Sequence, residues 1–329
     1  MLAELSTFCG SVDLTLDRKK TFVWSNSAYH RTNFRKLGLP IQRHARGLGA
    51  QLQFGRQHST AIIRKRIEEI QPLWNRLRQS VSPYKVKVMA IKQAAWSCCL
   101  HGIAATSLSH DTFVALRTQA MRGINAYGAG CNSGVHLGLI EHPLLDPYCW
   151  SIVATFRTIR ECAAKEQLTV LLQEAVLGSR KLPPTGMTSI LLARIHHLGW
   201  EVVHGDRCHD GLGEFSFLDI SFPALLLRIT WSWQKCVAAM VSHRKTFAGL
   251  ADCDPVSTRE YIDTLSLPEQ GLMRKALNGA LFTNDSVCHF SSSGSTVCQF
   301  CGEEDSRLHR FWQCKVFDED RAKVSSEFW

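Results

Sequence analysis

The sequence predicts a mostly α-helical protein with a short β segment near its N-terminus and a small metal-binding module near its C-terminus. Three observations lead to this fold class. Apolar residues recur at three- and four-residue steps through much of the chain, which is typical of amphipathic helices. Strand-like runs are confined to the first 42 residues. Close to the end, three cysteines and a histidine have the spacing of metal ligands.

Length and composition exclude several classes of protein. With 329 residues, of which 45% are hydrophobic and 20% charged, the chain is long enough for two or three units with cores. No apolar run approaches the length of a membrane span, and the first residues do not resemble a signal peptide. The 13 cysteines are irregularly spaced and odd in number, which indicates reduced thiols in an intracellular protein.

Positive charge is concentrated in the N-terminal third. The net charge of +9 divides into +12 for residues 1–100, +2 for residues 101–250 and −5 for residues 251–329. A basic region of this kind predicts a polyanionic partner, with nucleic acid as the first expectation. From charge alone, a solvated basic face without a partner is an equally good interpretation.

Residues 1–58 are expected to form the β segment. The pattern over 11–24 indicates a strand, a turn and a second strand. Residues 34–42 are interpreted as a further strand, whose length Gly38 and Pro40 limit.

Residues 59–126 are expected to form a basic helical domain, and its first helix covers 59–79. Pro72 should kink or divide this helix. The apolar residues that share one face are Ile63, Ile67, Ile70, Trp74 and Leu77. A second helix is expected from the N-cap Ser82, with Pro83 in its first turn, to about Cys99.

A third helix is expected from about Ser109. Its buried residues are Phe113, Leu116 and Ala120, with Arg117 and Arg122 outside. Packed together, three such helices would leave Lys and Arg side chains on an outer surface, which favours salt-dependent binding to a phosphate backbone. The candidate contacts on these helices are Arg64, Lys65, Arg66, Arg76, Arg78, Lys85, Lys87 and Lys92. Trp24, Trp74 and Trp96 could stack on bases, although a core position is favoured for Trp74.

Residues 127–284 are expected to be a helical connection region. The glycine-rich stretch 127–138 should interrupt the helices, and its glycines do not match a phosphate-binding loop. Further helices are expected from Asp146 to about Cys162, over 222–247 and over 267–281. The stretch 204–213 is interpreted as a loop.

Histidines in this region offer little chemistry. The adjacent His196 and His197 would point about 100° apart on a helix, so they would not share a ligand face. The loop also holds a polar group that is a weak candidate for a second metal site: His204, Asp206, Cys208, His209 and Asp210.

Residues 285–329 contain the most specific pattern, C-x2-C-x7-H-x4-C. Its members are Cys298, Cys301, His309 and Cys314. Thiolates and a neutral imidazole are good zinc ligands, so the spacing predicts one structural Zn²⁺ that supplies much of the module's folding energy. Four protein ligands leave no open position for a water, which disfavours catalytic zinc. Phe311 and Trp312 are expected to form the module's small core, and Cys288 and His289 are spare ligands at most.

The order of these parts resembles the C-terminal portion of non-LTR retrotransposon (LINE-type) reverse transcriptases. The segment "LTLDRKKTFVW" (14–24) is similar to the end of the palm, and "FRKLGLPI" (34–41) to the element near the primer grip. The basic helices resemble the thumb. Residues 272–321, which include the cysteines, resemble the C-terminal zinc-binding domain of such polyproteins.

This resemblance implies roles for individual residues. Lys19 or Lys20 would lie near the incoming nucleotide, and Leu37 and Gly38 near the primer grip. It further implies RNA and DNA, as template and primer, for partners, together with the rest of a polyprotein. A nuclear location is implied by the family alone, and no membrane association is expected.

One departure from the family limits what is expected of this chain. Family members hold two catalytic metal ions with aspartates, one set in an Asp-Asp turn, and no Asp-Asp dipeptide occurs here. Asp13 and Asp17 do not replace them. We therefore expect a chain that lacks the catalytic aspartates and the Mg²⁺ they would hold, and that cannot copy nucleic acid alone. It would then be the downstream part of a reverse transcriptase reading frame.

Two alternatives remain open. The chain could be a zinc-dependent protein-interaction module on a helical scaffold, which the acidic tail favours. A standalone enzyme of another class rests only on the histidine-rich stretch 204–209 and ranks lowest.

Overall fold

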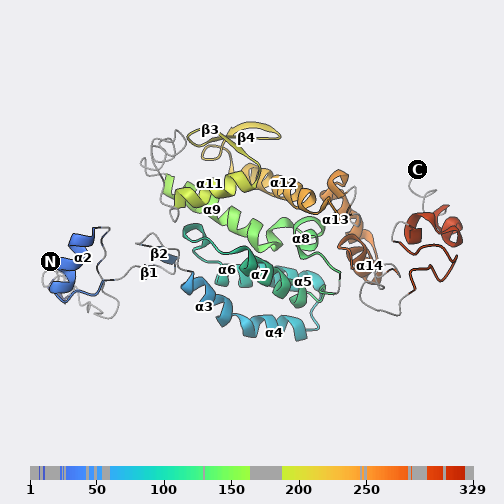
Figure 1. Ribbon diagram of the computed structural model, residues 1–329, viewed down its shortest axis with the longest axis horizontal. Helices are drawn as coiled ribbons and strands as arrows, with labels where there is room; N and C mark the ends of the chain where they lie inside the picture. Colours follow the sequence, from blue (N-terminus) through green and yellow to red (C-terminus); the bar gives the residue numbers. More distant parts are fainter. Residues whose placement is uncertain are drawn as a thin grey trace. The chain divides into compact units, whose positions relative to one another are not determined.

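The computed structural model is mostly helical (Figure 1). It describes residues 7, 10–11, 23, 25, 27–41, 44–47, 50–53, 60–128, 130–163, 187–244, 247, 250–280, 283, 295–306 and 309–322. Among these residues, no helix combines the length and the apolar character needed to cross a lipid bilayer. The expected strand pair at 11–24 lies mostly outside the described residues, as do Lys19, Lys20 and Trp24.

The chain divides into two units that are discontinuous in sequence. The first comprises residues 1–115 and 147–229, and the second comprises residues 116–146 and 230–329. The division falls within two long helices, α7 (His110–Gly123) and α12 (Phe222–Val241). The long helix expected over 222–247 therefore exists but ends six residues earlier.

The first unit opens with a helix where a strand was expected. Helix α2 spans Ala28–Lys36, so the prediction of a strand over 34–42 is wrong for its first residues. The Ser27 side chain caps the helix by accepting from the N–H of His30, and the chain turns at Gly38 with φ +68°. Beyond that turn, Ile41 forms a single parallel bridge with Val23. Strands β1 (His44–Gly47) and β2 (Ala50–Gln53) then pair antiparallel.

Pro72 divides the first basic helix, as expected. Helices α3 (Ala61–Glu69) and α4 (Gln71–Gln79) meet at Ile70, and Pro72 lies in the first turn of α4, where its missing N–H costs no hydrogen bond. Four of the five predicted core residues are buried, and Ile67 is half-buried.

The second basic helix also exists, with a π-helical turn in its middle. It consists of α5 (Tyr84–Ala90), the π turn η1 (Ile91–Ala95) and α6 (Trp96–Cys99). Trp96 is fully buried and lies against Trp74 with ring centroids 5.6 Å apart. Both rings therefore belong to the core, and the expectation that Trp96 could stack on bases is wrong.

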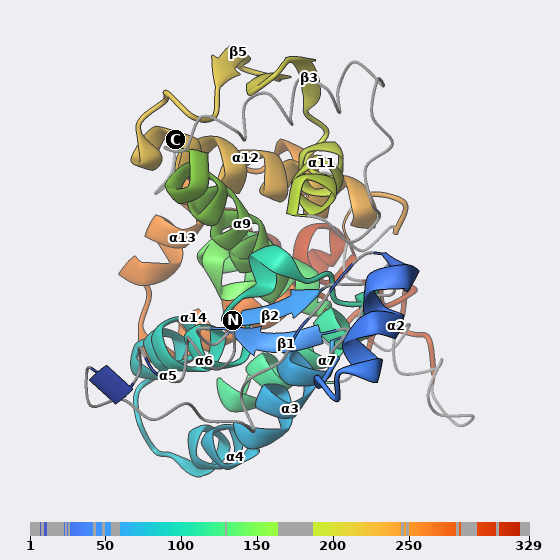
Figure 2. The same cartoon turned by 90° about the vertical axis from the view of Figure 1, so that its left-hand side faces the viewer.

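Helices α9 (Pro147–Ala163) and α11 (Met187–His197) lie side by side in the first unit, and both contact the 3₁₀ turn η2 (Ile103–Ala105) (Figures 1 and 2). Phe156 of α9 packs against the aromatic residues that, in sequence, directly precede and directly follow the three-stranded sheet described below. Its ring centroid lies 5.5 Å from those of Trp200 and Phe217, and both partners are buried. The helix expected from Asp146 to about Cys162 is confirmed as α9.

The expected loop at 204–213 is part of an antiparallel three-stranded sheet, a correction to the sequence interpretation. Its strands are β3 (Glu201–His204), β4 (Arg207–Asp210) and β5 (Gly213–Ser216), in that order. Two-residue turns that begin with glycine join them, and Gly205 takes φ +56°. The buried carboxylate of Asp210 accepts from Arg228 of α12 at 2.7 Å, which ties the sheet to that helix.

The second unit is built around a buried π-helical turn. Helix α8 (Ser133–Val135) continues into η3 (His136–Ile140), and the 3₁₀ turn η4 (Pro143–Leu145) follows. Every residue of η3 is buried. A Cβ added at Gly138 would lie 3.1 Å from Val237 Cγ2 and 3.2 Å from Trp233 Nε1, so only glycine fits without displacing its neighbours.

Arg117 is part of this unit's interior and not of an outer surface. Its guanidinium donates to the buried carboxylate of Asp146, at 2.8 Å from Nε, and lies over the ring of Trp233. The expectation that Arg117 faces outward is therefore wrong. The other predictions for α7 are confirmed, because Phe113, Leu116 and Ala120 are buried and Arg122 is exposed.

Two further helices pack on the π turn. Helix α13 (Pro255–Thr264) is capped by Asp254, and α14 (Leu267–Leu277) begins with a capping box formed by Ser266 and Glu269. The expected helix over 267–281 is thus confirmed to Leu277. Arg274 of α14 pairs with Glu141 at 2.8 Å, and the Asn278 amide contacts His136 Nδ1 at 3.1 Å.

The described residues also include three short helical turns. They are the 3₁₀ turn η6 (Leu250–Asp252), the π turn η7 (His309–Gln313) and the 3₁₀ turn η8 (Lys315–Phe317).

Candidate metal centre

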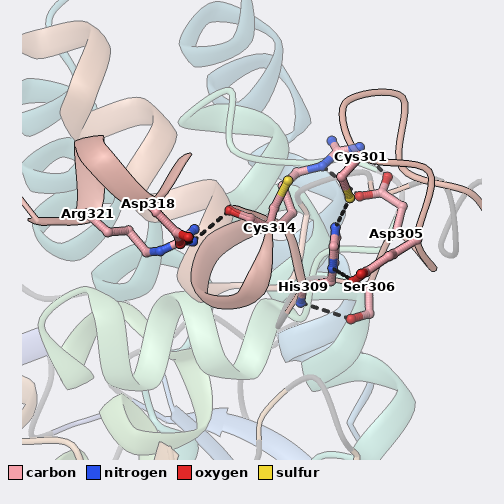
Figure 3. Close-up of polar contacts among 9 residues, drawn as sticks. Cys301, Asp305, Ser306, His309, Cys314, Asp318 and Arg321 are labelled. Carbon is pink, nitrogen blue, oxygen red and sulfur yellow. Dashed lines mark hydrogen bonds and ion pairs between the residues drawn. The ribbon is translucent and has the colours of Figure 1, made fainter. Parts of the chain in front are cut away.

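The four residues predicted as ligands come together in the structure. One ligand atom from each of Cys298, Cys301, His309 and Cys314 lies within 4.8 Å of the other three. Three of the residues are buried and Cys301 is half-buried. Figure 3 shows Cys301, His309 and Cys314 with their polar contacts. This group could hold one metal ion.

A tight turn presents the first two cysteines. The N–H of Cys298 donates to the carbonyl of Glu303 at 2.6 Å, and the N–H of Gly302 donates to the carbonyl of Cys298 at 2.9 Å. Gly302 takes φ +80°, a conformation that favours glycine. An antiparallel bridge between Val297 and Glu304 closes the base of the turn. The chain therefore curls so that both sulfurs face the same point.

One turn of helix presents the other two ligands. His309 begins the π turn η7, and its N–H donates to the hydroxyl of Ser306 at 3.0 Å. The N–H of Cys314 donates to the carbonyl of His309 at 2.6 Å, which brings the two ligands to one side of the turn. The His309 Nε2 lies 3.0 Å from the Cys301 sulfur, so the two halves of the module meet at the ligands.

A buried ion pair holds the two halves in register. The Asp305 carboxylate is fully buried and accepts from the guanidinium of Arg310, with 3.0 Å between Nε and Oδ1. The N–H of Asp305 also donates to the carbonyl of Thr296 at 2.8 Å. Sequence reasoning missed this pair, because Asp305 stands in an acidic run that looks like a solvated loop.

The pKa values of two of the thiols are shifted in opposite directions. Desolvation on its own raises the pKa of the Cys298 thiol, but hydrogen bonds from the N–H groups of Phe300 and Cys301, and from His309, lower it to about 7. The N–H of Glu303 lowers the pKa of Cys301, but desolvation and the neighbouring thiols together outweigh it, so the pKa is raised. Three thiols this close cannot all ionise without a compensating cation.

The imidazole is oriented by a carboxylate. His309 Nδ1 lies 3.5 Å from Glu303 Oε2, while its Nε2 faces the cysteines. A proton on Nδ1 suits this contact and leaves the Nε2 lone pair directed at the cluster. Arg321 supports the end of the module by donating to the carbonyl of Cys314 at 2.6 Å (Figure 3).

Four protein ligands are the number that a tetrahedral structural ion takes, so the group is compatible with such an ion. Other residues expected near the site lie outside what the structure describes. These are Cys288, His289 and the side chains of Phe311 and Trp312.

The polar side chains at 204–210, the weak candidate for a second metal site, do not come together around one point. Cys208 and Asp210 are buried on one side of β4, while His204 and His209 are exposed. Burial, with Asp206 and Asp210 nearby, raises the pKa of the Cys208 thiol to about 12, so this cysteine is an inert core residue. The suggestion of a second metal site here is not supported. His196 and His197 are both exposed on α11.

The basic residues predicted to contact nucleic acid differ in exposure. Lys87 is 3% exposed, so its inclusion in an outer surface is wrong. Arg66 and Lys92 are half-buried, and Arg66 donates to the carbonyl of His101 at 2.6 Å. The exposed members are Arg64, Lys65, Arg76, Arg78 and Lys85.

A comparison with protein-family models found no match to this chain, and a comparison with curated proteins found no significant relative.

Proposed function

We propose that this chain is a nucleic-acid-binding protein that descends from a non-LTR retrotransposon reverse transcriptase and carries one structural zinc ion. The order of sequence motifs supports the ancestry. The basic helices α3 to α5 support the binding activity, and the convergent Cys and His side chains support the zinc.

The basic helices carry the proposal of nucleic-acid binding. Residues 60–100 contain eight Lys and Arg against two Glu. Within the described part of the chain, the side chains of Arg64, Arg76 and Arg78 have no hydrogen-bond or ion-pair partner. Lys65 has only a loose, exposed contact with Glu69 at 3.8 Å, which contributes little. These side chains can therefore neutralise phosphates without first breaking a contact with another described residue.

The donor set supports zinc as the metal. Three thiol sulfurs are soft ligands and an imidazole nitrogen is a common zinc ligand, and four such ligands suit a tetrahedral zinc site. Hard oxygen ligands, which Ca²⁺ and Mg²⁺ prefer, are absent from the group. The ion would supply folding energy to the module and would take no part in a reaction.

Catalysis by this chain alone is not proposed. Polymerases use two metal ions held by aspartates, and the sequence contains no Asp-Asp dipeptide. The proposed partners are RNA and DNA in template–primer form, bound through their backbones, and the rest of a polyprotein. A nuclear location follows from the same ancestry.

Filter binding of a template–primer duplex by the full chain across a salt series tests the binding activity. We expect the logarithm of the binding constant to fall linearly with the logarithm of salt concentration, because bound phosphates release counterions. Absent or salt-independent binding would contradict the proposal.

Variants with matched changes in charge test whether the basic helices form the nucleic-acid-binding surface. The double variant Arg76→Gln/Arg78→Gln should reduce the salt slope by about 0.9 for each phosphate that the chain no longer neutralises. The control Arg244→Gln/Lys275→Gln removes the same charge from exposed positions in the second unit and should leave the slope unchanged. Equal effects of the two double variants would show that binding depends on the net charge of the chain and not on the basic helices.

A further inference from the structure

The metal-binding module leaves apolar side chains on its surface. Val297 is 42% exposed, Phe300 is 47% exposed and Val316 is 54% exposed. Phe300 packs edge-on against Phe317, with ring centroids 5.0 Å apart. This contact joins the turn that carries the first two cysteines to the segment that follows Cys314. Among the described side chains of the module, these three apolar residues face outward.

Carboxylates stand beside these apolar residues. Glu304 is directly opposite Val297 in an antiparallel bridge, which places the two side chains on the same face. Glu319 follows Val316 by three residues as the chain enters a helical turn, so these two also lie on one face. Both glutamates are exposed.

The module as a whole is acidic. Residues 295–322 contain six Asp and Glu against four Lys and Arg. Two of the four cations are already engaged inside the module, Arg310 with Asp305 and Arg321 with Asp318. Three thiolates around a divalent ion add a further negative charge, because a neutral imidazole contributes none. The surface potential therefore repels phosphates and attracts cations.

We infer that the surface of this module, which exposes Val297, Phe300, Val316, Glu304 and Glu319, docks a Lys/Arg-rich protein segment that carries an apolar anchor. The apolar side chains supply the desolvated centre of such a contact, and the carboxylates supply its polar rim. Nucleic acid does not fit this face, although the exposed ring of Phe300 could stack on a base in a basic setting. The inference rests on the proposed metal-stabilised module but is independent of nucleic-acid binding by α3 to α5.

Fluorescence anisotropy of the full chain with a labelled peptide tests the inference. The probe is a 12-residue peptide of alternating Lys and Arg with one central Leu, and a labelled single-stranded oligonucleotide serves as the second probe. Reversal of the two rim charges by Glu304→Lys/Glu319→Lys should weaken peptide binding by about tenfold, which corresponds to about 1.4 kcal/mol. Val316→Ser should also weaken it, because the anchor then faces a polar side chain.

A charge-matched control separates the face from net charge. Glu68→Lys/Glu260→Lys reverses two exposed glutamates elsewhere and should leave peptide affinity within about twofold of the unmodified chain. Metal content is measured for every variant, so that loss of the module is distinguished from loss of the docking face. Unchanged peptide binding in a metal-loaded Glu304→Lys/Glu319→Lys variant would overturn the inference. So would an oligonucleotide signal that falls in Val316→Ser but not in Arg76→Gln/Arg78→Gln.

Discussion

The imidazole Nε2 of His309 lies 3.0 Å from the sulfur of Cys301, although seven residues separate them in sequence. This contact is one of several that join the two halves of the module. The buried ion pair of Asp305 with Arg310 and the ring contact of Phe300 with Phe317 are others. A metal ion held by the four ligand atoms would add a further tie between the same two halves.

Removal of the metal should expose three particular thiols. Treatment with a chelator is expected to make Cys298, Cys301 and Cys314 reactive towards iodoacetamide, because a thiolate bound to metal is protected. Peptide mapping by mass spectrometry measures the alkylation of each cysteine.

Other cysteines act as internal controls in the same experiment. Cys98, Cys162 and Cys253 are exposed and should react with or without chelator. Burial raises the pKa of Cys99 and Cys208, so these two should stay unreactive in both conditions. Equal labelling of Cys298 before and after chelation would contradict a bound metal.

Asp305→Asn should weaken the module without removing a ligand. The amide keeps the shape of the side chain but loses the negative charge that pairs with Arg310. The Arg310 guanidinium then lacks a compensating charge in a largely buried position, which destabilises the module. We expect metal affinity to fall by about tenfold, measured by competition with a chelating dye. Glu304→Gln removes a neighbouring exposed carboxylate and should leave the affinity unchanged. A similar loss in both variants would indicate a general charge effect.

Stability should depend on pH through His136. This buried imidazole has its pKa lowered from 6.5 to about 4, because burial penalises the charged form. The unfolded chain takes up a proton as pH falls through about 6.5, whereas the folded chain does not until about 4, so the free energy of unfolding decreases over this window. The loss approaches about 3 kcal/mol, at about 1.4 kcal/mol for each pKa unit.

Chemical denaturation between pH 7.5 and pH 4 measures this effect. His136→Gln should flatten the profile of unfolding free energy against pH, since the amide does not titrate. His196→Gln alters an exposed histidine on α11 and should leave the profile as it is. If the two variants show the same pH dependence, His136 does not carry the effect.

Two glycines should respond oppositely to alanine. Gly138→Ala places a methyl group 3.1 Å from Val237 and 3.2 Å from Trp233, so overpacking should destabilise the chain by about 1 to 3 kcal/mol. Gly271 lies in α14 with nothing within 4 Å of an added Cβ, so Gly271→Ala should stabilise by up to about 1 kcal/mol. Thermal unfolding followed by circular dichroism compares them. If Gly138→Ala leaves thermal stability unchanged, the π turn η3 shifts to accommodate the added methyl group.

Sequence reasoning succeeded where the signal is local. Pro72 predicts the break between α3 and α4, and the cysteine spacing predicts a group that assembles from two turns. Pro72 acts within one turn, and the members of each ligand pair, 298 with 301 and 309 with 314, lie within five positions of each other.

Prediction from the sequence failed where tertiary contacts determine whether a side chain is buried or which element forms. Arg117 looks like an outward-facing cation on an amphipathic helix, yet it pairs with Asp146, which lies 29 residues further along the chain. Lys87 is buried by packing that a single helix does not reveal. The strand expected at 34–42 overlooked Ser27, whose side chain caps α2. The three-stranded sheet was missed because its strands are four residues each, too short for alternation to stand out.

The metal content of the purified full chain tests the central claim most directly. Elemental analysis by mass spectrometry, on protein prepared under reducing conditions, is expected to give one zinc per chain, and Cys298→Ser and His309→Ala should each lower this ratio. An exposed-histidine variant, His196→Ala, should retain one zinc. A chain with no bound zinc, with more than one, or with a ratio that the ligand variants leave unchanged would contradict the account.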